Sequence, residues 1–167
     1  GRLVLEGFVE RHGGYTTRVA RFPEDEIEQV YELRRLIETY AARRAARFAS
    51  AADIDALWRI HAEMAADTPP ADEAAQHRLI EANEAFHRRV ALAARSPRLM
   101  ALMTSVFDMG MVARTYRKFD ATDLERSLRH HSELITAIEA RAPDWAEALM
   151  SAHLLAGAAR VSAATQD

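Results

Sequence analysis

Six segments of this 167-residue chain repeat apolar residues at intervals of three and four, the spacing of one face of an α-helix. Glycine and proline are scarce, at six and five residues, which favours long uninterrupted helices. Short loops between the segments allow neighbouring helices to run antiparallel. We therefore predict an all-α fold, an antiparallel bundle of about six helices. The segments are residues 23–49, 50–66, the long stretch that contains 78–95, and 95–118, 120–141 and 143–164.

The composition sets limits on the kind of protein. Hydrophobic residues make up 49% and charged residues 28%, as in a folded globular protein. We see no signal peptide and no apolar run long enough to cross a bilayer, so we expect a cytoplasmic protein without membrane contact. Cysteine is absent, so any metal would need histidine and oxygen ligands. The net charge of −3 argues against a chain that binds nucleic acid over its whole surface.

The first residues differ from the rest. The stretch "EGFVERHGGYTTRVARF" alternates in strand fashion around a Gly-Gly pair, which predicts a β-hairpin. This end is locally basic, with Arg11 and Arg18 among its arginines. A lone hairpin is marginally stable. We therefore interpret residues 1–22 as the end of a domain whose beginning lies outside this chain, and residues 23–167 as the helical domain.

Three of the predicted helices carry polar groups within their apolar stripes. In "RLIEANEAFHRRVALAAR", residues 78–95, Asn83 and His87 share the stripe. His131 and His153 lie within the stripes of the last two helices. A buried imidazole without a partner costs roughly 1–3 kcal/mol. Three imidazoles that converge in one bundle could share a single divalent cation, which would satisfy them all.

Each of these histidines could instead be an ordinary hydrogen-bonded core residue. His61 lies equally within an apolar stripe, and we assign it no role. His130 shares its face with Asp123 and Ser127, and we expect it to point outward. A di-iron carboxylate site needs two Glu-x-x-His motifs, and only the one that ends at His87 is present, so we reject that site. Spacing alone permits three ligands among seven histidines but does not select them.

Four fragments, in order along the chain, resemble GntR-superfamily transcriptional regulators of the FadR/VanR class, with an FCD-type ligand-binding domain. "EGFVERHGGYTTRVARF" is similar to the end of a winged helix-turn-helix domain, including its β-wing. "VYELRRLIETYAARRAA" resembles the first helix of the effector domain, and "NEAFHRRVALAARSPRLMALM" resembles the family's Asp-x-x-x-His helix and the turn after it. "HHSELITAIEARAPDWAEALMSAHL" resembles the closing segment with two histidines. The resemblance implies a helical bundle that senses an effector.

Many members of that family hold a metal through one aspartate and three histidines. The resemblance places these ligands at Asn83, His87, His131 and His153. Asn83 departs from the commoner aspartate, because an amide oxygen can coordinate a cation but brings no negative charge. We therefore expect weaker metal affinity and a stronger pull on an anionic effector. Zn²⁺ suits imidazole ligands, and Ni²⁺ and Mn²⁺ stay open.

The resemblance also implies an effector site. It favours an inward Arg34 that binds an effector carboxylate through two hydrogen bonds. The alternative is an exposed arginine whose stem covers apolar surface, which is equally compatible with the spacing. Arg114 and Tyr116 are weaker candidates, and Met109 and Met111 could line an adaptable pocket.

The sequence is compatible with three functions. The first is the effector-sensing and dimerisation domain of a homodimeric regulator, in which a small carboxylate binds at the metal and shifts the two DNA-binding domains. In the full-length protein the missing N-terminal domain would bind operator DNA, and Arg11 and Arg18 of the wing could contact phosphates. The second is a small metal-dependent hydrolase, which would need a general base. The third is an interaction module with satisfied core histidines and no metal.

Overall fold

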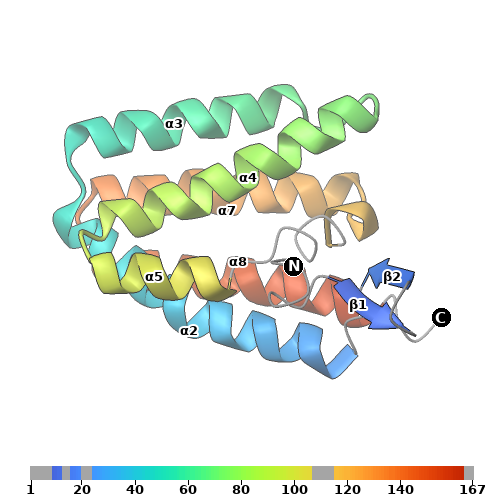
Figure 1. The fold of residues 1–167 in the computed structure, drawn as a ribbon. Helices are drawn as coiled ribbons and strands as arrows, with labels where there is room; N and C mark the ends of the chain where they lie inside the picture. The colour runs from blue at the N-terminus through green and yellow to red at the C-terminus, as the bar shows by residue number, and fades with distance from the viewer. Residues whose placement is uncertain (1–8, 13–15, 20–23, 107–114, 164–167) are drawn as a thin grey trace.

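The computed structural model describes residues 9–12, 16–19, 24–106 and 115–163, and the side chains of 28–104 and 115–160. The fold is all-α, as predicted (Figure 1). Helix α3 lies beside α4, α2 beside α8, and α7 packs against α8, α3 and α2. The described helices are α2 (Glu24–Phe48), α3 (Ala51–Ala66), α4 (Glu73–Ala93), α5 (Pro97–Val106), α7 (Ala121–Glu139) and α8 (Pro143–Ala163).

The predicted hairpin is confirmed. Strands β1 (Val9–His12) and β2 (Thr16–Val19) pair antiparallel, with Glu10 opposite Arg18 and Arg11 opposite Thr17. The side chains of Arg11 and Arg18 lie outside the described part, so the structure places only their backbone.

Side-chain caps determine where several helices begin. Ser50 caps α3 in a reciprocal capping box with Asp53, as its place in the sequence predicts. Asp120 and Asp123 form the same arrangement at the start of α7. The Ser96 hydroxyl accepts a hydrogen bond from the Leu99 backbone N–H, and Pro97 is the first residue of α5, where its missing N–H costs nothing. Each cap satisfies a backbone N–H that has no partner within its own helix.

The predicted fourth segment, residues 95–118, is described in two helical pieces. Helix α5 ends at Val106, and residues 115–118 are again helical. Residues 107–114 between them lie outside the described part, so the expected continuity of this segment is not tested. Among the described residues, no helix combines the length and the apolar character needed to span a bilayer.

The apolar core is densest along the second half of α2. The alanines of this half are almost completely buried, which lets neighbouring helices approach closely. The first half of the same helix directs larger polar side chains inward, and these lead to the candidate site. The buried alanines are Ala41, Ala42, Ala45 and Ala46 of the helix and Ala49 just after its end.

Candidate metal and effector site

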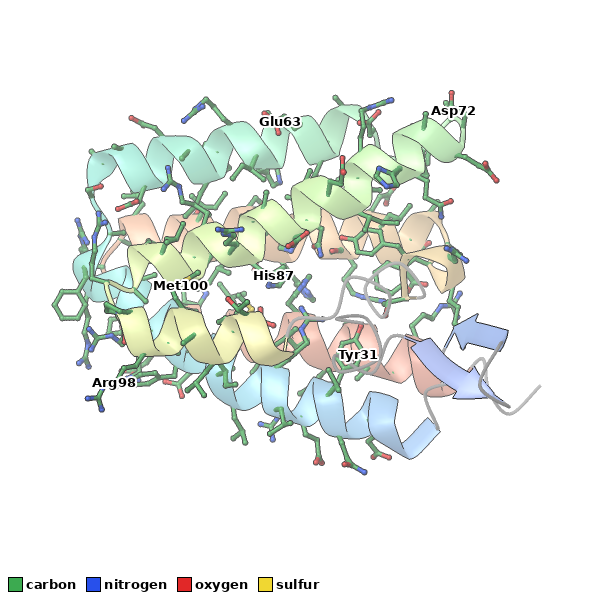
Figure 2. The ribbon with its side chains drawn as sticks, viewed as in Figure 1. Tyr31, Glu63, Asp72, His87, Arg98 and Met100 are labelled. Carbon is green, nitrogen blue, oxygen red and sulfur yellow. The ribbon has the colours of Figure 1, made fainter. Side chains whose placement is uncertain are left out.

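Three helices bring together the three histidines that the sequence singled out. His87 comes from α4, His131 from α7 and His153 from α8, and one ring nitrogen of each lies within 4.8 Å of the others. The Nε2 atoms of His131 and His153 are 3.3 Å apart. Figure 2 shows His87 near the middle of the bundle, with Tyr31 of α2 nearby. The helical stripes therefore converge as expected.

The environment keeps the imidazoles of His131 and His153 neutral. Burial lowers the pKa of His131 and of His153 well below the ordinary value, and the neighbouring histidines lower both further. The Phe86 ring stacks on His131 with a centroid separation of 4.2 Å, which closes that side against water. A neutral imidazole is the form that ligates a metal, since protonation removes the donor lone pair. The site is thus chemically prepared for a cation.

The geometry of the donors agrees with a divalent ion. Two imidazole nitrogens on a tetrahedral zinc, each at about 2.0–2.1 Å, would lie about 3.3 Å apart. The 3.3 Å between the Nε2 atoms of His131 and His153 matches this value. The other separations, at most 4.8 Å, would have to shorten slightly around an ion. In addition, Nδ1 of His131 is buried and has no hydrogen-bond partner among the described residues. The residues present therefore fit a metal.

Asn83 lies one helical turn before His87 on the buried face of α4. Its Oδ1 accepts a hydrogen bond from the Tyr116 hydroxyl at 2.8 Å. An amide oxygen has two lone pairs, so one remains for a cation. Tyr116, named above as an effector candidate, is itself buried and orients Asn83. Both residues line the same cavity as His87 and His153.

Arg34 points inward. Its side chain is 5% exposed, and its Nε donates a hydrogen bond to Oε1 of Glu38 at 2.7 Å. The other oxygen of Glu38, Oε2, contacts Nδ1 of His87. Burial alone would raise the pKa of Glu38, but the charge of Arg34, together with the hydrogen bonds from His87 and Arg34, outweighs it and holds that pKa at about 2. An ionised carboxylate therefore sits inside the bundle, beside the histidines.

Sequence reasoning missed Glu38, although a signal was present. Glu38 follows Arg34 by four residues, so both lie on one face of α2. The same face continues into the buried alanines, including Ala41 and Ala45. A carboxylate in register with a buried stripe is a strong indication of a paired internal charge.

A small cavity lies between Arg34, Asn83, His87, Tyr116 and His153, with about 30 Å³ open to the centre of a water molecule. This is enough for an ion and one or two waters. Besides the residues above, the cavity is lined by Tyr31, Thr115, Phe119, Asp123, Arg126, Ser127, His130, Leu154, Ala156 and Gly157.

The expectation that His130 points outward is wrong. His130 lines the cavity, its ring centroid is 6.0 Å from that of His153, and its Nδ1 has no hydrogen-bond partner among the described residues. Burial also lowers its pKa. The reason is that α7 packs against α8, α3 and α2, so it buries more than one stripe. Asp123 and Ser127, on the same face as His130, are buried as well.

The remaining candidates fall outside this cluster. His61 is a core residue whose Nε2 lies 3.2 Å from the Leu128 carbonyl oxygen, and it is not part of the metal cluster. His77 is exposed, beside Glu81. Arg114, Met109 and Met111 lie outside the described residues, so their proposed roles are not tested.

Comparisons with known proteins agree with this architecture. The chain is similar in structure to E. coli McbR/YncC, with a TM-score of 0.83 and 14% identity, over 98% of this chain and 77% of that chain. It is also similar to the transcriptional regulator GntR from Rhodococcus sp. RHA1, with a TM-score of 0.77 and 19% identity, over 98% and 76% of the two chains. A third similar structure is that of Listeria monocytogenes Lar, with a TM-score of 0.75 and 15% identity, over 97% and 76%.

At these identities the structural likeness establishes the fold alone. A comparison with curated protein sequences gives no match. The profile of the FCD domain, in contrast, matches residues 29–156, which is most of the chain and includes all three convergent histidines. The chain therefore belongs to the FCD domain family.

Proposed function

We propose that this chain is the effector-sensing domain of a DNA-binding transcriptional regulator, in which His87, His131 and His153 hold a divalent metal ion. A small organic acid would bind in the same cavity. The observation that carries this proposal is the convergence of the imidazoles of His87, His131 and His153, next to a buried arginine that lines the same small cavity as His87 and His153.

Asn83 would be the fourth protein ligand, through the Oδ1 lone pair that Tyr116 does not use. Zinc suits this donor set best, and nickel and manganese are further candidates. The ion would supply a positive charge that neither Asn83 nor the three neutral imidazoles compensate. That charge favours an anionic ligand in the open coordination positions.

Arg34 would help to bind the organic acid. It lines the cavity from α2 and is held in place by Glu38. Only about 30 Å³ is open to the centre of a water molecule, so an acid larger than a few waters requires the surrounding helices or side chains to move apart. A ligand that binds only the widened form shifts the population toward it. This movement is what would report the effector to the rest of the regulator.

Residues 1–22 would be the wing of a winged helix-turn-helix domain, and residues 23–167 the sensing domain. Arg11 and Arg18 on the paired strands would then contact DNA phosphates, which position a protein without reading sequence. Operator recognition belongs to the rest of that DNA-binding domain.

A second copy of the chain is the proposed partner of the exposed face of α2. Leu33, Leu36 and Tyr40 recur at intervals of three and four on this helix, and each is about half exposed or more. Exposed apolar side chains in one stripe favour burial against another protein. A homodimer would cover the stripe and couple the two sensing domains.

The alternative of a metal-dependent hydrolase gains no support from the carboxylates described around the cavity. Glu38 is engaged by Arg34 and His87, and Asp123 by Arg126 and Arg160. Glu84, the acidic neighbour of Asn83, lines a separate surface groove. A general base needs a carboxylate or imidazole free to take a proton from water.

The test is the metal content of protein purified without a nickel column, measured by elemental analysis. We expect near-stoichiometric metal in the wild type and a large loss in His87→Ala, His131→Ala and His153→Ala. His61→Ala is the matched control, because it removes a core histidine that lies outside the cluster. Metal-loaded protein is then screened with small carboxylates by thermal shift, with Arg34→Met as the comparison.

Folded wild-type protein that neither contains metal nor binds added Zn²⁺ would overturn the metal assignment. Equal metal content in all four variants would do the same. If metal is present but no carboxylate raises the melting temperature, the organic acid is the part that fails.

A further inference from the structure

A carboxylate from another helix, α2, contacts one of the three histidines, His87. Glu38 is 1% exposed, and its two oxygens have different partners. Oε1 accepts the hydrogen bond from Arg34, and Oε2 lies against Nδ1 of His87, whose side chain is fully buried. A buried carboxylate is costly unless both oxygens are satisfied, so this contact is strongly favoured.

The contact determines which nitrogen of His87 carries the proton. A carboxylate accepts hydrogen bonds, so Nδ1 is the protonated nitrogen of the neutral ring and Nε2 carries the lone pair. The His87 ring centroid lies 5.1 Å from that of His153 and 5.6 Å from that of His131. With Nδ1 occupied by Glu38, Nε2 is the atom available to a metal shared with these rings.

Charge gives Glu38 a second role. Asn83 occupies the position where an acidic ligand would bring a negative charge, and the three imidazoles are neutral. Carboxylates that accept the second N–H of a metal-bound histidine raise its basicity, and losing them typically costs about 10–100-fold in metal affinity. Glu38 is placed to act in this way, while Asp123, also at the cavity, is already engaged by two arginines.

We propose that Glu38 is a positioning residue of the metal site, which holds His87 in the ligating tautomer and supplies, from behind its ring, the negative charge that Asn83 does not bring. The inference rests on the proposed metal site. It predicts that a carboxylate introduced at position 83 restores part of the zinc affinity that is lost when the carboxylate at position 38 is removed.

The first experiment measures the dissociation constant for Zn²⁺ by competition with a chromophoric chelator. We expect Glu38→Gln to weaken zinc binding about 10–100-fold. Asn83→Asp should tighten it, and the double variant should return toward the wild type. Glu147→Gln is the matched control, since Glu147 is also paired with an arginine of α2, Arg43, but its side chain is 43% exposed at the protein surface.

The second measurement needs no variant and therefore does not depend on whether Glu38→Gln folds. Two-bond ¹H–¹⁵N correlation spectra of the wild type report the tautomer of each histidine. We expect His87 protonated at Nδ1 both before and after Zn²⁺ is added, with the metal-dependent change at Nε2. A proton on Nε2, or zinc bound through Nδ1, overturns the inference.

The outcomes separate this inference from the proposed function. Wild-type protein that binds no zinc overturns both. Zinc bound equally well by the wild type and by folded Glu38→Gln overturns only the role of Glu38, and so does a double variant that binds no better than Glu38→Gln. If Glu38 served only to pair with Arg34, Glu38→Gln would lower the stability of the protein. The tautomer of His87 and the gain in zinc affinity from Asn83→Asp would then not depend on Glu38.

Discussion

Helix α2 has the same helical spacing throughout, but the side chains that it buries differ along its length: they are large and polar up to Glu38 and small and apolar from Ala41 on. In the second half, Ala42, Ala45 and Ala46 are fully buried and let other helices approach closely. In the part up to Glu38, which we call the polar half, Arg34 and Glu38 are almost as buried, but Arg34 lines a cavity and Glu38 contacts His87. The small alanine side chains let neighbouring helices pack closely. The large polar side chains must stay in contact with their hydrogen-bond partners, and a cavity is left beside them. Burial alone therefore does not distinguish packing from function.

The largest loss of stability is expected when the buried ion pair in the polar half of α2 is removed. Arg34→Met leaves Glu38 with only part of its charge compensated, and breaking a buried pair typically costs about 3–5 kcal/mol. Chemical denaturation of metal-free protein would measure the loss. Arg47→Met, on the exposed end of the same helix, should change the unfolding free energy by less than about 1 kcal/mol. Equal losses in both variants would show that the buried pair contributes little.

Low pH should also lower the stability of the folded protein, through the histidines near the polar half of α2. Burial keeps His131 and His153 neutral in the folded state, while the unfolded chain binds protons below its ordinary histidine pKa of 6.5. Stability is therefore complete above that pH and falls as pH decreases through it, by about 1.4 kcal/mol per pH unit for each histidine until the folded pKa is reached.

This is measured as the unfolding free energy of chelator-treated protein between pH 8 and pH 5. The variant His131→Gln should flatten the curve, and His77→Gln, at an exposed site, should not change it. A curve that is already flat in the wild type would contradict the buried neutral state.

Overpacking tests the apolar half. Ala45→Leu adds three carbons where the side chain is fully buried, which should cost about 1–3 kcal/mol. Zinc content of the folded protein should stay unchanged, because the substitution lies two turns from Glu38. Ala101→Leu, on an exposed position of α5, is the control and should stay within about 0.5 kcal/mol of the wild type. Loss of zinc in Ala45→Leu would mean that the two halves are coupled.

The smallest effect is expected away from both halves. Ser50→Ala removes the capping box of α3 and should lower stability by about 1 kcal/mol, measured by chemical denaturation. The zinc affinity should not change. A change in zinc affinity would show that the start of α3 influences the metal site, which the comparison between the two halves of α2 does not include.

The sequence predicted more of the convergent histidines than of their surroundings. The apolar stripes placed His87, His131 and His153, and equally His61, on buried helix faces, and the family resemblance made the selection among them. His130 was misplaced, because one stripe does not reveal that α7 is enclosed by three other helices. Glu38 was overlooked, because its partner His87 lies 49 positions away and no local spacing connects them.

By itself, the sequence determined the helices, their caps, the hairpin and the faces that turn inward, since these depend on interactions within a few residues. Only the tertiary structure decided which inward faces meet, that Glu38 reaches His87, and that Tyr116 holds Asn83. The physical reason is that contacts between helices depend on their packing and on the side chains of both partners, and neither is encoded in the period of a single helix.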